Sequence, residues 1–390
     1  MGFMRTNDSY SKIENDYFEI VTDIQALRAL RSDWEDLCRR SSQHRFSQSF
    51  VWCWTTWEVV EGPRGRRLHS IVARNRGRVV LIWPFIVYRK SFLRVAAPLG
   101  CAYAEYPDPL VEDGSEADRR IEKAWQILRH TCGCDMIQLP YVREGSKLHF
   151  LVGELGKKVR IVSRLTNLSV SWHNYENWQS YYRGRSSKDR QEDRRRRRQL
   201  DERGRVTFEV IEGEKCAAAI DWALANKVRQ LAQTNRRVGG WLKTRDYRNL
   251  LAEVASRSSH EGRIVVFVLK LDDQIIATLI GRVDKVRIEG LSTVYDADYR
   301  RYAPGRLLLC DVLRWAFERR LDYDLRGGDE PYKKRWANRE SAVFTCEVVN
   351  SALYALYGWS PTVRPFIRGY RVAKRKLGQY VMDKFHLRLL

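Results

Sequence analysis

The chain has 390 residues, of which 44% are hydrophobic and 30% are charged. This composition excludes a largely disordered chain and is enough for two to three domains of roughly 100–200 residues each. The net charge of +22 predicts an anionic partner, namely nucleic acid, an acidic lipid surface or a phosphate-bearing cofactor, although a merely solvated basic surface has the same composition.

Neither the apolar segments nor the cysteines predict a membrane or secreted protein. The uncharged stretch from Val79 to Tyr88 is far shorter than the ~20 residues that span a bilayer. The N-terminal residues MGFMRTNDSYSKIENDY contain no apolar core of a secretory signal. The eight cysteines include no CxxC pair, and Cys132 and Cys134 have no second pair at zinc spacing. We therefore expect reduced thiols, no metal site and a cytoplasmic location.

In the first half, the spacing of apolar residues predicts alternating strands and helices. In chain order we expect a strand at 18–22, helices at 24–39 and 48–60, strands at 66–73 and 78–88, a helix at 115–130 and a strand at 135–139. Trp52, Trp54 and Trp57 crowd the second helix. They could stack on nucleotide bases, but we expect them in the core.

The second half repeats this order in outline. We expect a strand at 167–172, a polar helix or helix pair at 176–203, a strand at 206–211, helices at 214–232 and 246–257, strands at 264–271, 274–283 and 286–295, a helix at 306–320 and a strand at 322–325. The repetition predicts an N-terminal domain at 1–165 and a second domain at 166–350. A basic helical segment at 351–390 would follow, either lying on an anionic membrane surface or docked on the domain.

The loop after Tyr295 is a candidate anion site. It is rich in arginine and enters the next helix through Ala303, Pro304 and Gly305. The first turn of a helix has unpaired N–H groups and the positive end of the helix dipole, and small residues let a phosphate approach them. An ordinary capped helix start is the alternative.

The order hairpin, third strand, arginine-glycine loop, helix and strand resembles the cofactor-binding half of the GNAT acyltransferases. The residues Tyr295-Asp296, Tyr299, Pro304-Gly305 and the string Gly328-Asp329-Glu330-Pro331-Tyr332-Lys333 resemble more specifically the CelD-like branch, which is linked to cellulose biosynthesis and related to the FemAB transferases. The resemblance implies an α/β protein with a tandem pair of GNAT-like domains and mixed central sheets. It also implies that the second domain binds acetyl-CoA or another acyl-CoA. The pyrophosphate would be held by Arg300, Arg301, Tyr302, Ala303, Gly305 and Arg306.

A second basic feature runs from Arg183 to Arg205 and includes five consecutive arginines, Arg194 to Arg198. Five consecutive residues point all round a helix, so they cannot form one stripe. Three interpretations stay open: a solvated helix face, a contact to coenzyme A or an anionic acceptor, and tRNA binding. The last matters because FemAB relatives take aminoacyl-tRNA as donor.

The histidines are dispersed, and the sequence indicates no Ser-His-Asp or Cys-His arrangement. Direct transfer of the acyl group therefore suits this chain better than a covalent intermediate. Candidate bases are Asp329, Glu330 and Glu289, and Tyr332 is a candidate acid. Lys333 could hold an anionic acceptor or a phosphate. Alternatively, Asp329 only caps the turn at Pro331 and Glu289 faces solvent.

The sequence therefore predicts an acyl-CoA-dependent acyltransferase, with acetyl as the expected group, and without a metal. The resemblance implies an amine or hydroxyl acceptor on a sugar or a cell-envelope or exopolysaccharide precursor. The alternatives are a FemAB-type transferase that uses aminoacyl-tRNA, and a non-catalytic basic scaffold that contacts tRNA or an anionic membrane.

Overall fold

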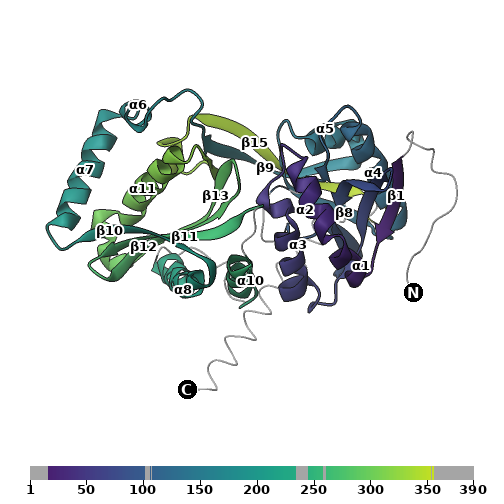
Figure 1. The fold of residues 1–390 in the computed structure, drawn as a ribbon, viewed down its shortest axis with the longest axis horizontal. Coiled ribbons are helices and arrows are strands. Elements are labelled where there is room, and N and C mark those ends of the chain that lie inside the picture. The colour runs from purple at the N-terminus through teal and green to yellow at the C-terminus, as the bar shows by residue number, and fades with distance from the viewer. Residues whose placement is uncertain are drawn as a thin grey trace, which may run out of the picture.

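The computed structural model describes residues 16–101, 106, 108–233, 245–257, 261–352 and 354. It forms two halves, each built of strands covered by helices, and strands β9 and β15 pass from one half to the other (Figure 1). The basic helical segment predicted at 351–390 lies outside the described residues, apart from 351, 352 and 354.

The N-terminal half holds the first eight strands. They are β1 (Asp16–Val21), β2 (Arg67–Leu68), β3 (Ser70–Asn75), β4 (Arg78–Trp83), β5 (Phe85–Lys90), β6 (Leu93–Pro98), β7 (Leu110–Val111) and β8 (Met136–Arg143). Its helices are α1 (Ile24–Ala29), α2 (Arg31–Arg39), α3 (Phe50–Thr56), α4 (Ala117–Thr131) and α5 (Lys147–Glu154), with short helical turns at Phe46–Gln48, Trp57–Glu61 and Gly156–Lys158.

The C-terminal half follows the long strand β9 (Val159–Val170). Its other strands are β10 (Val206–Glu212), β11 (Arg263–Leu271), β12 (Gln274–Val283), β13 (Arg287–Tyr295), β14 (Asp322–Gly327) and β15 (Arg339–Val349). Its helices are α6 (Trp178–Arg183), α7 (Ser187–Asp201), α8 (Cys216–Gln233), α10 (Arg245–Ser256), α11 (Pro304–Glu318) and α12 (Pro331–Lys334), with 3₁₀ turns at Gly213–Lys215 and Ala297–Tyr302.

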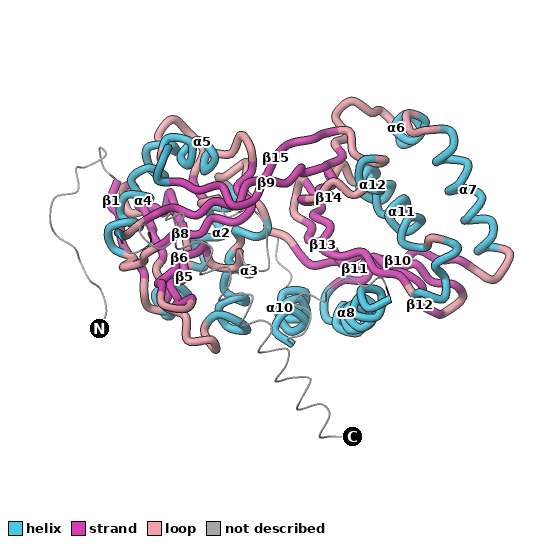
Figure 2. Tube along the Cα trace, turned by 180° about the vertical axis from the view of Figure 1, so that it is seen from behind, coloured by secondary structure: helices cyan, strands magenta, loops and turns pink. Residues whose placement is uncertain are grey.

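One sheet runs through both halves. Its eleven strands lie in the order β10-β11-β12-β13-β14-β9-β15-β8-β6-β5-β2, and a second sheet of four strands has the order β1-β3-β4-β7. Strand β15 pairs with β9 on one side and with β8 on the other, so it joins the two halves through main-chain hydrogen bonds. Figure 2 shows this ribbon crossing between the halves. The predicted α/β class with mixed sheets is confirmed, because the large sheet contains both parallel and antiparallel pairs.

Strand β11 shows how the C-terminal half is layered. Ile264, Val266 and Val268 pack into a cluster with helices α8 and α10, whereas the alternating Val265 and Phe267 pack with α11 on the opposite face. Successive side chains of a strand point to opposite faces, so a strand covered on both faces needs an unbroken apolar run. This explains why the sequence RIVVFVLKL has no polar alternation.

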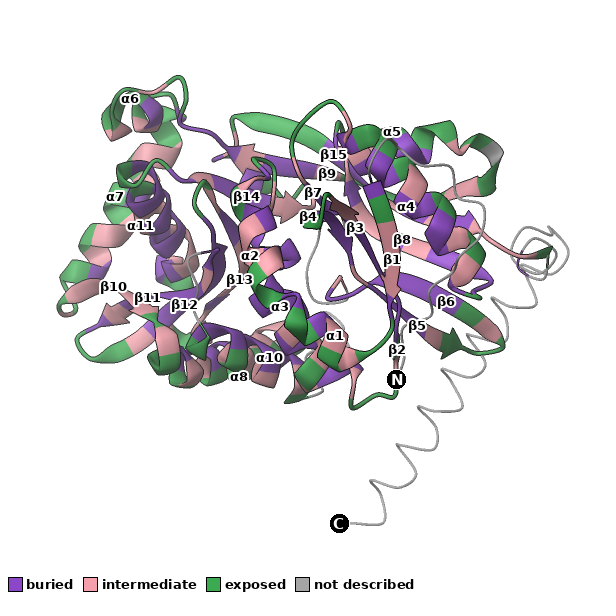
Figure 3. Ribbon diagram, turned by 45° about the vertical axis from the view of Figure 1, so that its right-hand side comes forward, coloured by how far each residue is buried: buried purple, intermediate pink, exposed green. Residues whose placement is uncertain are grey.

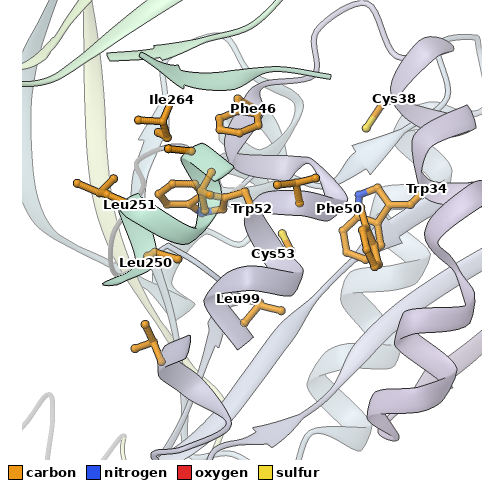
Figure 4. Packing of buried hydrophobic residues seen from close by; sticks show 14 of the residues in the cluster. Trp34, Cys38, Phe46, Phe50, Trp52, Cys53, Leu99, Leu250, Leu251 and Ile264 are labelled. Carbon is orange, nitrogen blue, oxygen red and sulfur yellow. The ribbon is translucent and has the colours of Figure 1, made fainter. Parts of the chain in front are cut away.

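The cluster under α3 ties the two halves together. Trp52 is fully buried and lies near Leu250, Leu251 and Ile264 of the C-terminal half (Figure 4). Trp54 and Trp57 are partly buried against the same cluster. The prediction that these tryptophans belong to the core is therefore confirmed for Trp52, and its neighbours line that core.

Several elements differ from the sequence prediction. The helix expected at 24–39 is two helices that meet at Leu30, and the strand expected at 78–88 is divided between the two sheets at Pro84. Proline has no N–H to donate to a ladder, so the chain changes partners there. The sequence analysis missed β6, α5, β15 and the first half of β9, which carries exposed polar and apolar residues without the pattern of a covered strand.

We expect Trp52→Ala to lower the free energy of unfolding by about 3–5 kcal/mol, because it leaves a large cavity between the halves. Trp54→Ala is the matched control and should cost less, since Trp54 is only partly buried. Urea denaturation of both variants measures the difference. Equal losses would contradict the central place of Trp52 in this core.

Candidate active site

The candidate active site is a wedge between two parallel strands that separate. Strands β13 and β14 pair only at Arg287–Asp322, Ile288–Tyr323 and Glu289–Asp324. Beyond these pairs a bulge interrupts β13, because Ile280 of β12 faces Ser292 while the next residue faces Gly290, which leaves Leu291 extra. A bulge bends its strand and increases the twist, so β13 turns away from β14.

Strand β14 is bent as well. Arg326 has a left-handed backbone with φ of 64°, and its N–H donates to Asp324 Oδ1 at 2.8 Å. The pairing of β14 with β9 shifts register in the same place, between Asp324 and Gly327. Both walls of the wedge are thus bent just after the last shared pair.

The wedge opens into a cleft of about 690 Å³. Its walls come from β13, from β14 and the residues after it, from the start of α11, and from α8. Six basic side chains and one carboxylate, that of Glu330, line it, so an anionic ligand is favoured. The basic residues are Lys227, Arg300, Arg306, Arg326, Lys333 and Arg335.

Helix α11 starts in the wall of this cleft. Ala303 precedes it with a left-handed backbone, φ of 48°, and no side chain caps the first turn. Ala303 and Gly305 both line the cleft. A Cβ on Gly305 would lie 3.5 Å from Thr293 and Tyr295, so glycine leaves the space beside the helix start open. Pro304 has no N–H, and the N–H groups of Arg306 and Leu307 donate to the Ala303 carbonyl, so the Gly305 N–H is the group of this first turn that is left for an anion.

The structure places the predicted cofactor residues in two groups. Arg300, Ala303, Gly305 and Arg306 line the cleft. Tyr302 is buried beneath the loop among apolar side chains, and the Arg301 guanidinium lies 4.7 Å from its ring centre. Neither of these two side chains is among the cleft-lining residues.

Arg306 already has two carboxylate partners. Its guanidinium contacts Asp189 at 3.0 Å and makes a close ion pair with Asp193, both on α7. These contacts raise the pKa of Arg306 despite its partial burial, so it stays charged. Arg306 thus fixes α7 against α11, and part of its charge is neutralised before any ligand arrives.

The loop after β14 brings Glu330, Tyr332 and Lys333 to the cleft. Asp329 is instead directed to solvent, with 76% of its side chain exposed and Lys334 at 3.8 Å. Desolvation raises the pKa of Tyr332 to about 12, so its hydroxyl stays protonated at neutral pH. Of the two adjacent acids that the sequence suggested as bases, the geometry favours Glu330.

Lys333 is buried and holds the end of β14. Its ammonium donates to the Gly327 carbonyl at 2.8 Å and to the Arg326 carbonyl at 3.4 Å, and it pairs with Glu330 at 2.9 Å. Burial acts to raise the pKa of Glu330, but the hydrogen bond from Lys333 lowers it overall, so this carboxylate is ionised at neutral pH. Lys333 therefore shapes the cleft wall and anchors its carboxylate.

Tyr323 is a site residue that the sequence analysis missed. It pairs with Ile288, one pair before the strands separate, and a Cβ on Gly290 would come within 2.4 Å of its hydroxyl oxygen. Burial raises the pKa of Tyr323 well above its usual value, so the hydroxyl remains a donor. The register pairs Tyr323 with Ile288, and only the folded structure brings its hydroxyl against Gly290 across the wedge, so no local sequence pattern could have found it.

Glu289 is not exposed to solvent, and it does not line the cleft. It is buried at the last pair of the wedge, beside Asp324, and contacts Arg45 at 2.8 Å and Arg282 in a close ion pair. Burial alone would raise its pKa, but the Arg282 and Arg45 guanidinium groups lower it to about 2. An anion held so firmly between two cations is poorly suited to act as a general base.

The arginine run is the exposed helix α7 (Figure 3). Several arginines bind within the protein: Arg195 and Arg196 pair with Glu192, and Arg197 pairs with Asp311 of α11. Arg194 and Arg198 are exposed. The helix is thus partly a structural brace for α11 and partly a solvated basic face.

Residues 187–334 match the family model of the acetyltransferase (GNAT) domain. The chain therefore contains a GNAT-type acyltransferase domain. The matched segment contains the whole wedge, from α7 to α12, and confirms the predicted acyltransferase domain. Among curated proteins, no sequence matches this chain.

Similar solved structures show the same fold over most of the chain. The crystal structure of FemX is 11% identical with a TM-score of 0.60 and covers 87% of this chain and 99% of that chain. L-PGS from Bacillus licheniformis is 10% identical with a TM-score of 0.50 and covers 86% of this chain and 96% of that chain. At these identities the likeness concerns the fold alone.

Two further properties bear on cofactors and membranes. Within the described residues, no group of three or more His, Cys, Asp or Glu side chains is arranged to hold a metal ion. In the same part of the chain, no helix combines the length and apolar character needed to cross a bilayer.

We expect Glu289→Gln to lower the free energy of unfolding by about 3–5 kcal/mol, because it leaves Arg45 and Arg282 buried with less countercharge. A carboxylate whose pKa falls from 4.5 to about 2 on folding stabilises the protein above pH 4.5 and loses this effect toward pH 2. The stability difference between wild type and variant should therefore shrink as the pH falls through that window.

Denaturant titrations of both proteins between neutral and acidic pH make this measurement. If Glu289 acted as the general base instead, the variant would keep its stability at neutral pH and lose turnover alone. That outcome would contradict the structural role.

Proposed function

We propose that this protein transfers an acyl group from acyl-CoA, with acetyl-CoA as the expected donor, directly to an amine or hydroxyl acceptor in the wedge between β13 and β14. The observation that carries the proposal is the opening of two parallel strands beside the uncapped start of α11. Acyl-CoA fits such a site because its phosphate end, its amide-bearing arm and its thioester each meet a different part of the cleft.

The phosphate end would meet the start of α11 and Arg300, where positive charge and small residues coincide. The amide-bearing arm would run along β13. There the carbonyls of Leu291 and Thr293 accept side-chain hydrogen bonds from Arg326 at 3.5 Å and Lys227 at 3.3 Å. Main-chain groups held this way can exchange a side-chain partner for the amides of a ligand.

The thioester would then lie near the apex, between Gly290 and Tyr323. The acceptor nitrogen or oxygen bonds to the acyl carbon, the carbon–sulfur bond breaks, and the thiolate takes up a proton. Tyr323 is the nearest protonated hydroxyl to the apex and is proposed as that donor. The attacking atom becomes acidic as its bond forms, so the ionised Glu330 can accept its proton despite a lowered pKa.

The finer parts of the proposal rest on the resemblance to the CelD-like branch. They are an acceptor on a sugar or on a cell-envelope or exopolysaccharide precursor, and a cytoplasmic location where acyl-CoA is available. The exposed Arg194 and Arg198 of α7 support a second candidate, transfer from aminoacyl-tRNA. Titrating the protein with acetyl-CoA and with aminoacyl-tRNA at the same salt concentration distinguishes the two donors.

Gly305→Asp should weaken acetyl-CoA binding by at least tenfold, because it puts a carboxylate beside the helix start that would hold the pyrophosphate. Gly305→Ala is the matched control: its Cβ makes only ordinary contacts at 3.5 Å and adds no charge, so the loss should be smaller. Calorimetric titration and the melting temperature of each variant separate binding from folding. Unchanged affinity in Gly305→Asp would place the phosphate elsewhere.

Glu330→Gln should lower turnover by roughly 10²-fold or more with little change in acyl-CoA affinity, as expected on removing a proton acceptor. Asp329→Asn changes the neighbouring carboxylate, which is 76% exposed and outside the cleft lining, and should keep turnover within a fewfold of wild type. Thiol release measures both variants. A larger loss in Asp329→Asn would reverse the assignment.

A further inference from the structure

The first half of β9 has an unoccupied edge beside the cleft. Strand β15 pairs with β9 from Val159 to Ser169 apart from the bulged Val162, but β14 pairs with β9 only at Val170, Ser169 and Asn167. The segment that follows β14 leaves the edge of β9 at Gly328, whose N–H donates to the Thr166 carbonyl at 2.8 Å. From Arg160 to Leu165, no strand of the described chain pairs with this edge.

The orientation of the main chain can be assigned there. Thr166 directs its carbonyl toward β14, and main-chain polar groups alternate sides along a strand. Arg164, two residues earlier, therefore directs its N–H and carbonyl to the same side, where no strand among the described residues pairs with them. An open row of donors and acceptors is a template for a further strand.

The side chains of this edge are unusually apolar for an exposed strand. Ile161 is 59% exposed, Val162 41% and Leu165 38%. Leu165 also reaches the cleft wall, because its Cδ1 lies 3.3 Å from the position of a Cβ on Gly327. The edge thus lies next to a residue of the cleft wall.

We propose that this edge binds an extended peptide as an added strand and that the peptide's N-terminal amine is the acyl acceptor. The proposal rests on the proposed function and narrows its acceptor to a peptide. Extended peptides join exposed sheet edges through main-chain hydrogen bonds, while alternate side chains supply contacts of their own.

The direction follows from the sheet. Strand β14 runs antiparallel to β9, so a peptide antiparallel to β9 continues the line of β14. Its N-terminus then lies next to Gly328, at the cleft. The Glu330 carboxylate lies over that glycine, 2.5 Å from the position of a Cβ, where it would meet an ammonium group. A parallel peptide would bring its negatively charged C-terminus to this carboxylate, which is unfavourable.

The chemistry is that of the proposed function. The α-ammonium group first releases one proton to solvent and becomes a neutral amine. Its nitrogen then bonds to the acyl carbon of acyl-CoA and gives its second proton to Glu330, while the carbon–sulfur bond breaks and the thiolate takes up a proton from Tyr323. The products are an N-acylated peptide, free coenzyme A and one released proton. No oxidant or metal enters the balance.

The test uses the full chain, acetyl-CoA and a mixed-sequence hexapeptide amide library with free N-termini. Hydrogen exchange should slow at residues 160–165 when the library is added, and free coenzyme A should appear. The same library with N-methylated amides should give neither effect, because it cannot donate to the edge. The N-acetylated library should protect the edge without releasing coenzyme A.

Arg164→Pro removes the outward N–H while keeping the pairing with β15, and proline is tolerated at such an edge position. It should weaken protection by the library roughly tenfold, whereas Arg164→Ala keeps the N–H and isolates the side-chain contribution. If the proline variant does not fold, the N-methylated library still decides the matter on the wild-type protein.

The outcomes separate this proposal from the proposed function. Acetyl-CoA binding without any protection at millimolar peptide overturns the edge proposal and leaves the acyltransferase proposal intact. Protection without acetyl-CoA binding supports the peptide-binding edge but overturns the acyl-CoA proposal, and with it the role of the peptide amine as acyl acceptor. Protection of 160–165 in the protein alone also overturns the edge proposal: dependence on protein concentration would indicate a second copy on the edge, and independence would indicate the chain's own segment.

Discussion

A buried arginine from one half holds the two strands of the other half at the point where they part. Arg45 contacts Glu289 at 2.8 Å and Asp324 at 3.1 Å, and these carboxylates are neighbours in the last pair between β13 and β14. Two buried like charges side by side would repel each other, so the cation between them is required. The wedge therefore depends on a residue that lies far from it in the sequence.

The surrounding residues extend this network and connect it to the core between the halves. Tyr106 donates to Asp324 at 2.8 Å, and the Arg45 guanidinium lies 4.2 Å from the centre of its ring. Arg282 binds Glu289 and lies 5.0 Å from the ring centre of Trp52. The same residues hold the two halves against each other and hold the strands at the apex of the cleft. The N-terminal half therefore acts as a positioning scaffold for the acyltransferase domain.

The cleft and the β9 edge follow from one geometric event, the early end of β14. Its bend at Arg326 opens the wedge on one side, and its departure at Gly328 leaves β9 unpaired on the other. Lys333 stabilises that departure by binding the carbonyls of Arg326 and Gly327. A short strand thus provides both a space for a donor and an edge for an acceptor.

The sequence by itself determined the α/β class, the three apolar strands of the C-terminal half, the helix entry at Gly305 and the motif around Tyr332, because these depend on local periodicity and turn chemistry. It also indicated a GNAT-type domain from the order of its elements. The tertiary structure decided the roles: Glu289 is a buried structural anion, Asp329 lies in solvent, and Tyr323 faces the apex. Strand register and contacts with Arg45, 244 residues away from Glu289 in the sequence, set these roles, and no local pattern contains them.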